Sequence, residues 1–310
     1  MKKVWRSIKK SMSSPSKGAR TVPVSVNAVV IPRDAHPISR RDISPAAVKV
    51  LNRLDQAGYA AFLVGGGVRD LLLGMHPKDF DVTTDATPEQ IRKLFSNSMI
   101  IGRRFRLVHV RYGREIVEVA TFRGAGGDTD KPVHEKAKSG ILLNDNVWGS
   151  MEEDAFRRDF TVNALFYNIA DFSVVDYCHG MRDLEAKQIC VIGDPVVRYR
   201  EDPVRMLRAV RLSAKLGFTI EQASAKPIAE MANLLSHVSP ARLFDEFVKM
   251  LVGGKAEATF ASLQRYDLFG HLFSQAANIV QDERAGYASA LIKAALRETD
   301  NRVNADKSIN

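Results

Sequence analysis

Between Leu63 and Val82 the chain reads LVGGGVRDLLLGMHPKDFDV, and this stretch decides the fold. It predicts an apolar strand, a glycine turn, a short helix beginning at Val68, and a second strand that carries Asp79 and Asp81. Side chains two residues apart on a strand point to the same face of a sheet, so these carboxylates repel each other unless a cation lies between them. The pair is therefore a candidate Mg²⁺ site for phosphoryl transfer.

The three glycines at positions 65–67 supply the other half of this pattern. A glycine turn that opens a helix exposes backbone N–H groups, which can bind a triphosphate. No Gly-Lys-Ser/Thr follows the glycines, so the motif is not a P-loop. Alone, each half has an ordinary explanation, because Asp-x-Asp is usually two solvated carboxylates and three glycines usually mark a tight turn. Together they resemble the nucleotidyltransferase signature of the family that contains bacterial poly(A) polymerases and CCA-adding enzymes.

Two further runs place polar groups where a catalytic site could use them. Glu118 lies inside the apolar strand predicted over residues 115–122, where a carboxylate requires a partner; an edge or paired glutamate is the alternative. Residues 152–165 predict one helix, on which Asp159 and Asn163 stand one turn apart and project together, beside Arg158. Such a pair suits a ribose hydroxyl and the arginine suits a triphosphate, although a salt-bridged amphipathic helix explains this run equally well.

A fourth run, residues 201–211, predicts a helix that begins with acidic residues in its first turn. Asp202 and Arg205 are neighbours on this helix, and Arg208 follows one turn later. A carboxylate beside a guanidinium offers an acceptor and a donor fork, which can recognise the edge of a base. A capped helix with an internal ion pair is the structural alternative.

All four runs stand in the order and spacing of the class II nucleotidyltransferases, and the resemblance covers residues 31–304. It implies that Asp79 and Asp81 bind two Mg²⁺ ions, with Mn²⁺ as a substitute, and that Glu118 or Asp159 is a further catalytic acid. Which of the two is essential stays open. ATP as substrate is implied to contact Gly65, Gly66, Arg69, Arg158, Asn163, Asp202, Arg205 and Arg208.

Local signals predict an α+β head with a mainly antiparallel sheet, followed by an all-helical remainder. Ser44-Pro45 begins a helix that ends at Gly58, and Thr87 to Gln90 forms a capping box. The runs on either side of Gly113 predict an antiparallel hairpin. Beyond Ser150 the pattern is helical except for a short strand and turn at 174–180. The predicted division is a basic flexible tail (1–41), a catalytic head (42–182), a helical neck (183–252) and an incomplete RNA-binding body (253–310).

The basic charge is concentrated at the N-terminus. Residues 1–41 hold ten lysines and arginines and one acid, a net charge of +9 that equals the net charge of the whole chain. Such an arm favours a polyanion, either RNA or an anionic membrane surface contacted peripherally. The candidate RNA-binding residues are Lys2, Lys3, Arg6, Lys9 and Lys10.

The expected cellular compartment is inferred from signals that the sequence does not contain. There is no secretory signal and no apolar stretch long enough to span a bilayer. Cys178 and Cys190 form no CxxC motif and no cluster with histidine, so a cytoplasmic protein without zinc is expected.

The function implied is template-independent transfer of AMP from ATP to RNA 3′ ends, with release of pyrophosphate. Segments 31–36, 38–44, 102–110 and 239–246 resemble the polymerases more than the CCA-adding enzymes, which are the first alternative. A non-catalytic RNA-binding protein is the second, because family members typically continue well beyond position 310. RNA-degradation proteins are a further class of partner that the resemblance implies.

Overall fold

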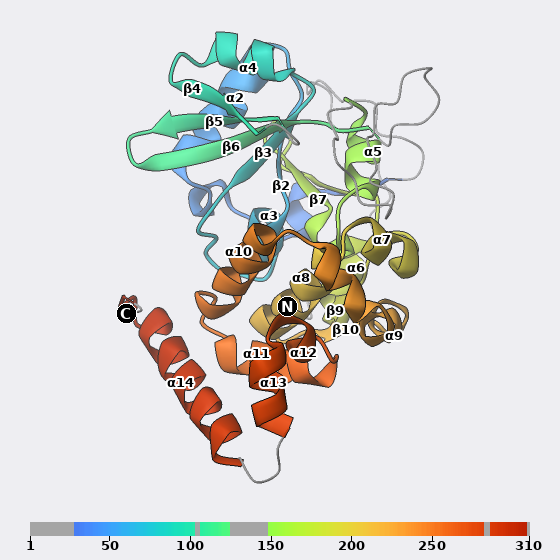
Figure 1. The fold of residues 1–310 in the computed structure, drawn as a ribbon. Coiled ribbons are helices and arrows are strands. Elements are labelled where there is room, and N and C mark those ends of the chain that lie inside the picture. The colour runs from blue at the N-terminus through green and yellow to red at the C-terminus, as the bar shows by residue number, and fades with distance from the viewer. Residues whose placement is uncertain (1–27, 103–105, 125–147, 282–285, 309–310) are drawn as a thin grey trace. The chain divides into compact units, whose positions relative to one another are not determined.

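The computed structural model describes residues 28–102, 106–124, 148–281 and 286–308. These residues form two compact units, 28–184 and 185–308 (Figure 1). Each unit has its own set of buried apolar side chains, and each is described by itself below.

The first unit is built on a sheet whose strands run in the order β1-β8-β7-β2-β3-β6-β5-β4. Every neighbouring pair is antiparallel except β3 and β6, which are parallel. The α+β class with a mainly antiparallel sheet is confirmed. The strands are β1 (Val29–Ile31), β2 (Ala61–Val64), β3 (Asp81–Thr84), β4 (Ser98–Ile101), β5 (Leu107–Tyr112), β6 (Glu115–Thr121), β7 (Leu165–Asn168) and β8 (Val174–Asp176).

The helices of this unit begin where the local signals predict. The Ser44 side chain caps α2 (Pro45–Gln56), and Thr87 and Gln90 form the predicted capping box of α4 (Pro88–Leu94). Helix α2 packs against β2, β3 and β6 through an apolar face that is fully buried (Figure 1). The remaining helical segments are η1 (Arg33–Ala35), η2 (Arg40–Asp42), α3 (Gly66–Leu72), α5 (Met151–Phe156), η3 (Thr161–Asn163) and α6 (Gly180–Ala186).

Two local predictions are wrong in the region 152–165. The expected single helix ends at Phe156, and β7 follows η3 where a helix was expected. The chain leaves the helix because Phe160 and the β7 residues Phe166 and Tyr167 are buried in the sheet and its packing, with Phe160 1% exposed. Phe156, the last residue of α5, is 49% exposed. Tertiary burial overrides the helical pattern here.

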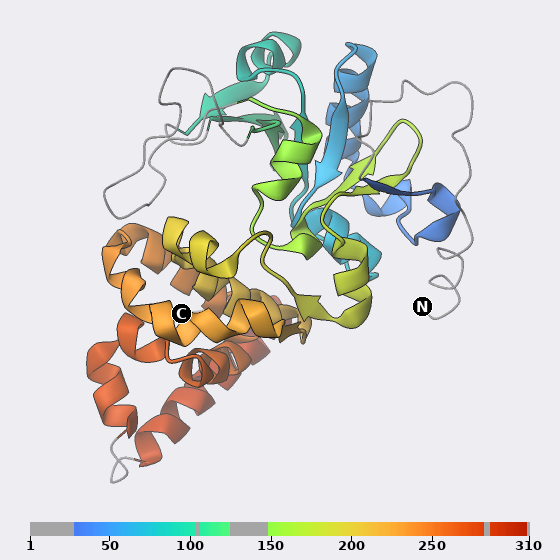
Figure 2. The same ribbon diagram turned by 90° about the vertical axis from the view of Figure 1, so that its right-hand side faces the viewer.

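The expected flexible tail also ends earlier than residue 41. Strand β1 pairs with β8 at the edge of the sheet, and η1 and η2 follow it (Figure 2). Ile31 and Ile38 are each only 1% exposed, so this segment belongs to the folded unit. The remainder of the predicted tail, residues 1–27, lies outside the described residues.

The second unit is mainly helical. Inside it, Phe269 packs against both Phe260 and Phe273. Its elements are β9 (Gln188–Ile189), α7 (Pro195–Glu201), α8 (Val204–Leu216), β10 (Thr219–Ile220), α9 (Gln222–Met231), η4 (Ala232–His237), α10 (Pro240–Leu251), α11 (Ala256–Arg265), α12 (Phe269–Leu272), α13 (Ser274–Gln281) and α14 (Gly286–Asn304). Across both units, no described helix has the length and apolarity that a membrane span requires.

Candidate active site

Strand pairing brings Asp81 and Glu118 face to face. Asp81 begins β3, and its register partner on the parallel strand β6 is Glu118. Asp79 stands two residues before Asp81, just outside the strand, and the Phe80 side chain between them is buried. On its other side, Glu118 pairs with His109 of β5, whose Nε2 lies 3.2 Å from Glu118 Oε1.

The electrostatics of Asp81 reflect this crowding. Burial raises the pKa of Asp81 from 3.8 to about 6, and the nearby carboxylates of Glu118 and Asp79 add to the rise while Arg158 opposes it. A carboxyl group with a raised pKa among other acids is a position where a cation is favoured. Glu118 itself keeps a half-exposed side chain, so a solvated ion can reach it.

The glycine turn lies directly against this pair. Gly65 has a φ of 77°, a left-handed conformation that favours glycine, and it caps α3. A Cβ atom added at Gly65 would lie 3.7 Å from Asp81 Oδ2 and 3.8 Å from Arg158 Nη1. A carboxylate and a guanidinium therefore both lie beside the bare Cα of Gly65. Helix α3 begins at Gly66, two residues before the predicted start at Val68.

Arg69 connects the glycine turn to the segment that carries Asp159 and Asn163. It is 4% exposed, and its Nε and Nη2 donate to Asp70 Oδ1 at 2.8 and 2.6 Å. Its Nη1 donates to Asn163 Oδ1, and Asn163 Nδ2 donates to Asp159 Oδ1 at 3.2 Å. Asp159 and Asn163 thus project together as predicted, but across a turn into η3 rather than along one helix.

Arg158 is oriented by Asp154, which is not among the predicted site residues. Arg158 Nη2 donates to Asp154 Oδ2 at 2.7 Å, and its guanidinium carbon lies 5.3 Å from the centre of the Phe166 ring. Asp154 is 3% exposed and also accepts from the backbone N–H of Arg123. The four-residue spacing of Asp154 and Arg158 is the signal that could have found this pair.

The base-recognition candidates lie in the second unit, and their helix begins later than predicted. Glu201 ends α7, and Asp202 is the residue after it, before α8 begins at Val204. Asp202 Oδ2 accepts from Arg242 Nη2 at 3.0 Å, whereas its Oδ1 is buried and has no hydrogen-bond partner. Arg205 is 9% exposed and its Nη1 donates to the Arg198 carbonyl at 2.7 Å.

Helix α10 supplies partners to this region that sequence reasoning missed. Arg242 contacts Asp202, and Glu246, which is 3% exposed, pairs with Arg211 of α8. Both lie in the segment 239–246, whose resemblance to the polymerases was its only sequence signal. Arg208 of α8 is half-buried.

Two predictions, a metal site and a basic RNA-binding segment, have no complete counterpart among the described residues. No group of three or more histidine, cysteine or acidic side chains in the described ranges is already arranged to hold a metal ion. Lys2, Lys3, Arg6, Lys9 and Lys10 lie outside the described residues.

Comparison with known proteins identifies the family of this chain. A family model described as the poly A polymerase head domain matches residues 61–190, which include every candidate site residue of the first unit. A second, described as a probable RNA and SrmB-binding site of polymerase A, matches residues 217–279. Poly(A) polymerase I of Salmonella typhi is 50% identical over 304 residues, which are 97% of this chain and 65% of that protein. The chain belongs to the poly(A) polymerase family.

CCA-adding enzymes are more distant members of the same group. The enzyme of Lactobacillus helveticus is 39% identical over 221 residues, which cover 71% of this chain and 53% of that protein. The crystal structure of the Bacillus stearothermophilus CCA-adding enzyme in complex with CTP matches with a TM-score of 0.66 at 30% identity, over 80% of this chain and 58% of that chain. This member of the poly(A) polymerase family spans about two thirds of the length of its curated polymerase relatives.

Proposed function

We propose that this protein adds AMP from ATP to RNA 3′ hydroxyl groups without a template and releases pyrophosphate. The observation that carries the proposal is the cross-strand pair Asp81 and Glu118 beside the Gly65 turn and Arg158. Acidic side chains and phosphate-binding groups lie next to each other in this arrangement, as phosphoryl transfer requires. Asp79 and the glycine turn precede and flank the pair.

Divalent metal ions, with Mg²⁺ as the preferred ion, fit the acidic side of this site. The pKa of Asp81 is raised to about 6, with burial as the largest cause, and hard cations prefer clustered carboxylate oxygens. Asp79, Asp81 and Glu118 would hold the ions. Bound there, two such ions would activate the attacking 3′ oxygen and neutralise charge on the leaving pyrophosphate. The choice of Glu118 over Asp159 as the third ligand is supported by the register, which places Glu118 opposite Asp81.

Arginine side chains of the protein would bind the part of the triphosphate that the metal ions do not contact. Arg158 lies beside Gly65, as Asp81 does, and is held by Asp154, so its guanidinium is positioned before a substrate arrives. Arg69 is likewise fixed by Asp70. Asn163, bonded to both Arg69 and Asp159, presents an amide suited to a ribose hydroxyl. Backbone N–H groups at the start of α3 complete the phosphate-binding side.

We assign selection of the incoming base to Asp202, with Arg205 and Arg208 beside it on α8. Asp202 Oδ1 is a buried acceptor without a partner, and such an atom needs a donor from a ligand. The exocyclic amino group of adenine is a donor of this kind. Cytosine carries one as well, so CCA addition is the second candidate function, supported by the likeness to the CCA-adding enzymes.

One assay separates these functions. The 310-residue chain is incubated with Mg²⁺ and each labelled nucleoside triphosphate, with either a generic RNA or a tRNA that lacks its CCA end. Poly(A) polymerase activity predicts AMP incorporation into both RNAs and little CMP. CCA addition predicts CMP incorporation that is confined to the tRNA. RNA binding without any product would contradict both and leave an RNA-binding protein. Asp81→Asn serves as the inactive control in every arm.

The setting of the reaction is part of the proposal. ATP and RNA 3′ ends as substrates, together with two thiols that form no disulfide, suit a cytoplasmic enzyme. RNA-degradation proteins are proposed partners that would consume the tailed RNA, and the basic N-terminal residues are proposed to contact RNA or a membrane surface.

A further inference from the structure

A cavity of the first unit lies away from the carboxylates. It has a volume of about 570 Å³, which is the size range of small-molecule sites, and its walls come from η1, η2, α2 and the β7–β8 connection. Tyr167 lines it, while Phe166, the residue before it on β7, lies in the same register row as Asp81. Successive side chains on a strand point to opposite faces, so this pocket and the carboxylate pair lie on opposite faces of the sheet.

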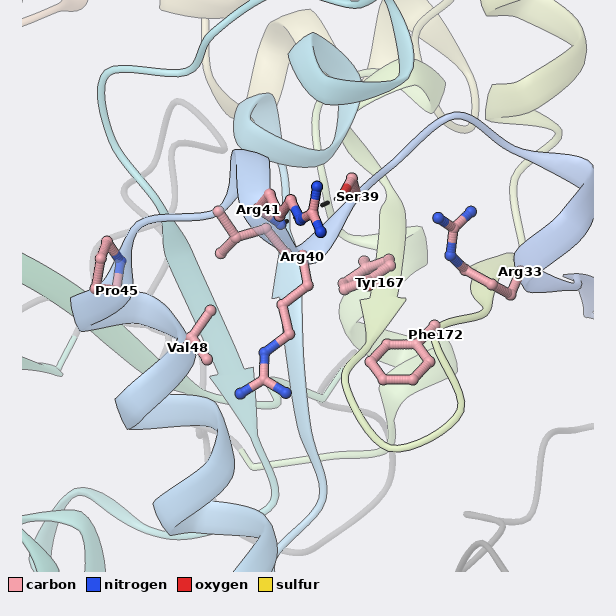
Figure 3. A pocket seen from close by; sticks show the side chains of 9 residues that line it. Arg33, Ser39, Arg40, Arg41, Pro45, Val48, Tyr167 and Phe172 are labelled. Carbon is pink, nitrogen blue, oxygen red and sulfur yellow. Dashed lines mark hydrogen bonds between the residues drawn. The ribbon is translucent and has the colours of Figure 1, made fainter.

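Three cations surround this pocket without a carboxylate partner. Arg33, Arg40 and Arg41 line it, and no described acidic side chain lies within ion-pair distance of any of them. No lining residue is acidic. Figure 3 shows Arg33 and Arg40 on either side of the Tyr167 ring. Exposed arginines gathered in this way around a concave surface favour an anion.

The Tyr167 hydroxyl is an unmet hydrogen-bonding group of the same pocket. Tyr167 is 0% exposed, and its hydroxyl has no hydrogen-bond partner. A buried hydroxyl without a partner costs stability, and a ligand oxygen that accepted its proton would remove that cost. Burial raises the pKa of this phenol, so at neutral pH the hydroxyl carries its proton and can donate.

The aromatic wall of the pocket is held in a costly backbone conformation. Phe172 has a φ of 61°, in the left-handed region, and its carbonyl accepts a hydrogen bond of 2.8 Å from His36 Nε2. The Phe172 ring lines the pocket near Tyr167 (Figure 3). A non-glycine residue held in this region by its surroundings is a feature that often accompanies a binding site. A flat apolar ring beside arginines can stack on a base.

We propose that this pocket binds a phosphorylated nucleotide, with its phosphate between Arg33 and Arg40 and its base against Phe172. The Tyr167 hydroxyl donates a further hydrogen bond to the phosphate. A free nucleotide and a nucleotide within an RNA chain present the same chemistry to these groups. The site is separate from the transfer reaction proposed above, because the sheet lies between them.

Residue-resolved arginine modification tests this proposal on the 310-residue chain. Phenylglyoxal labels exposed guanidinium groups, and mass spectrometry reports the rate at each one. AMP and a short oligo(A) are compared with adenosine and inorganic phosphate, and Arg114 in the β5–β6 turn is the matched exposed control. We expect AMP or oligo(A) to slow labelling of Arg33 and Arg40 and to leave Arg114 unchanged, and the stronger of the two identifies the source of the nucleotide.

Protection by adenosine equal to that by AMP would overturn the phosphate contact. Protection by inorganic phosphate equal to that by AMP would overturn the contact with the base. Equal protection of Arg114, or no protection, would overturn the site. The labelling rates of Arg33 and Arg40 report on this pocket, so a nucleotide bound near Asp81 does not slow them.

Two variants test the individual contacts with Arg40 as the reporter. Arg33→Gln should raise the AMP concentration for half-protection of Arg40 by about tenfold, because it removes a charged hydrogen bond. Tyr167→Phe should raise it too, while increasing the thermal midpoint of the ligand-free protein, since it deletes an unpartnered hydroxyl. The matched Arg114→Gln variant should change neither value. An unchanged half-protection concentration in both Arg33→Gln and Tyr167→Phe would show that these groups do not hold the phosphate.

Discussion

Asp81 and Glu118 stand opposite each other on the two parallel strands of an otherwise antiparallel sheet. They come from positions 37 residues apart along the chain in strands that the sequence alone does not pair. Their register places Glu118 beside Asp81. Among the charges that act on Asp81 are Glu118, Asp79 and Arg158.

The first prediction distinguishes the two candidate acids. Asp79→Asn, Asp81→Asn and Glu118→Gln should each lower AMP transfer by about a thousandfold or more, because metal-assisted stabilisation is worth several kcal/mol. Single-turnover rates with Mg²⁺–ATP measure this. Glu115→Gln on the same strand is the matched control and should leave the rate unchanged. A thousandfold loss in Asp159→Asn together with full activity in Glu118→Gln would reverse the assignment.

The second prediction concerns the stability of the metal-free protein. The folded-state pKa of Asp81 is raised, so its ionised form destabilises the fold, fully above pH 6 and not at all below pH 3.8. In a chelator, Asp81→Asn should therefore be more stable than the parent at pH 8, by up to about 3 kcal/mol, and by less at pH 5. Denaturant unfolding at both pH values measures the difference.

The control for this experiment is Asp55→Asn, at an exposed position of α2. It should change stability little, and equally at both pH values. A destabilised Asp81→Asn protein at pH 8 would contradict the prediction.

The third prediction tests Asp154 as a positioning residue. Asp154→Asn keeps the shape of the side chain but removes the charge that orients Arg158. We expect a raised KM for ATP and a loss of stability of about 3 kcal/mol or more, since one partner of a buried ion pair is removed. Steady-state kinetics and thermal unfolding report the two effects.

Glu152→Gln, on the same helix, is the matched control for Asp154. A variant that loses stability but keeps the parent KM for ATP would limit Asp154 to a structural role.

The fourth prediction addresses base selection. Asp202→Asn should reduce the preference for ATP over UTP, whose base carries a carbonyl in place of the amino group, by about 1–3 kcal/mol, the usual value of one good base-edge contact. Competition between the two labelled triphosphates measures the ratio directly. Arg205→Ala should act in the same direction, but Arg205 is nearly buried and bonds to the Arg198 carbonyl, so the asparagine variant is cleaner. Asp245→Asn on the exposed side of α10 is the control, and unaltered selectivity in Asp202→Asn would place base recognition elsewhere.

The fifth prediction concerns the basic N-terminal residues. Changing to glutamine the basic residues that precede β1 should weaken RNA binding and reduce its salt dependence, by a slope of about 0.7 for each lost phosphate contact. These residues are Lys2, Lys3, Arg6, Lys9, Lys10, Lys17 and Arg20. ATP binding should not change. Deletion through residue 41 is unsuitable, because it removes β1 from the sheet. A salt slope equal to that of the parent would exclude an RNA contact by this segment.

The sequence by itself determined the features that depend on neighbouring residues. Ser44 and Thr87 cap their helices as predicted, because a cap needs only a side-chain oxygen and the N–H groups two or three residues later. The hairpin around Gly113 follows from two short strands and the turn between them. The glycine turn next to Asp79 and Asp81 was recognised because its whole pattern lies within 20 residues.

Only the tertiary structure decided which distant groups meet. The contact of Arg69 with Asn163 joins positions 94 residues apart, and the pairing of Asp81 with Glu118 depends on a parallel register that no local signal fixes. Residues 160–168 have a helical pattern yet form η3 and β7, because burial of Phe166 and Tyr167 in the sheet outweighs a local preference of a fraction of a kcal/mol per residue. The pocket behind Tyr167 arises in the same way, from the distant segments 33–48 and 167–172 that the sheet edge brings together.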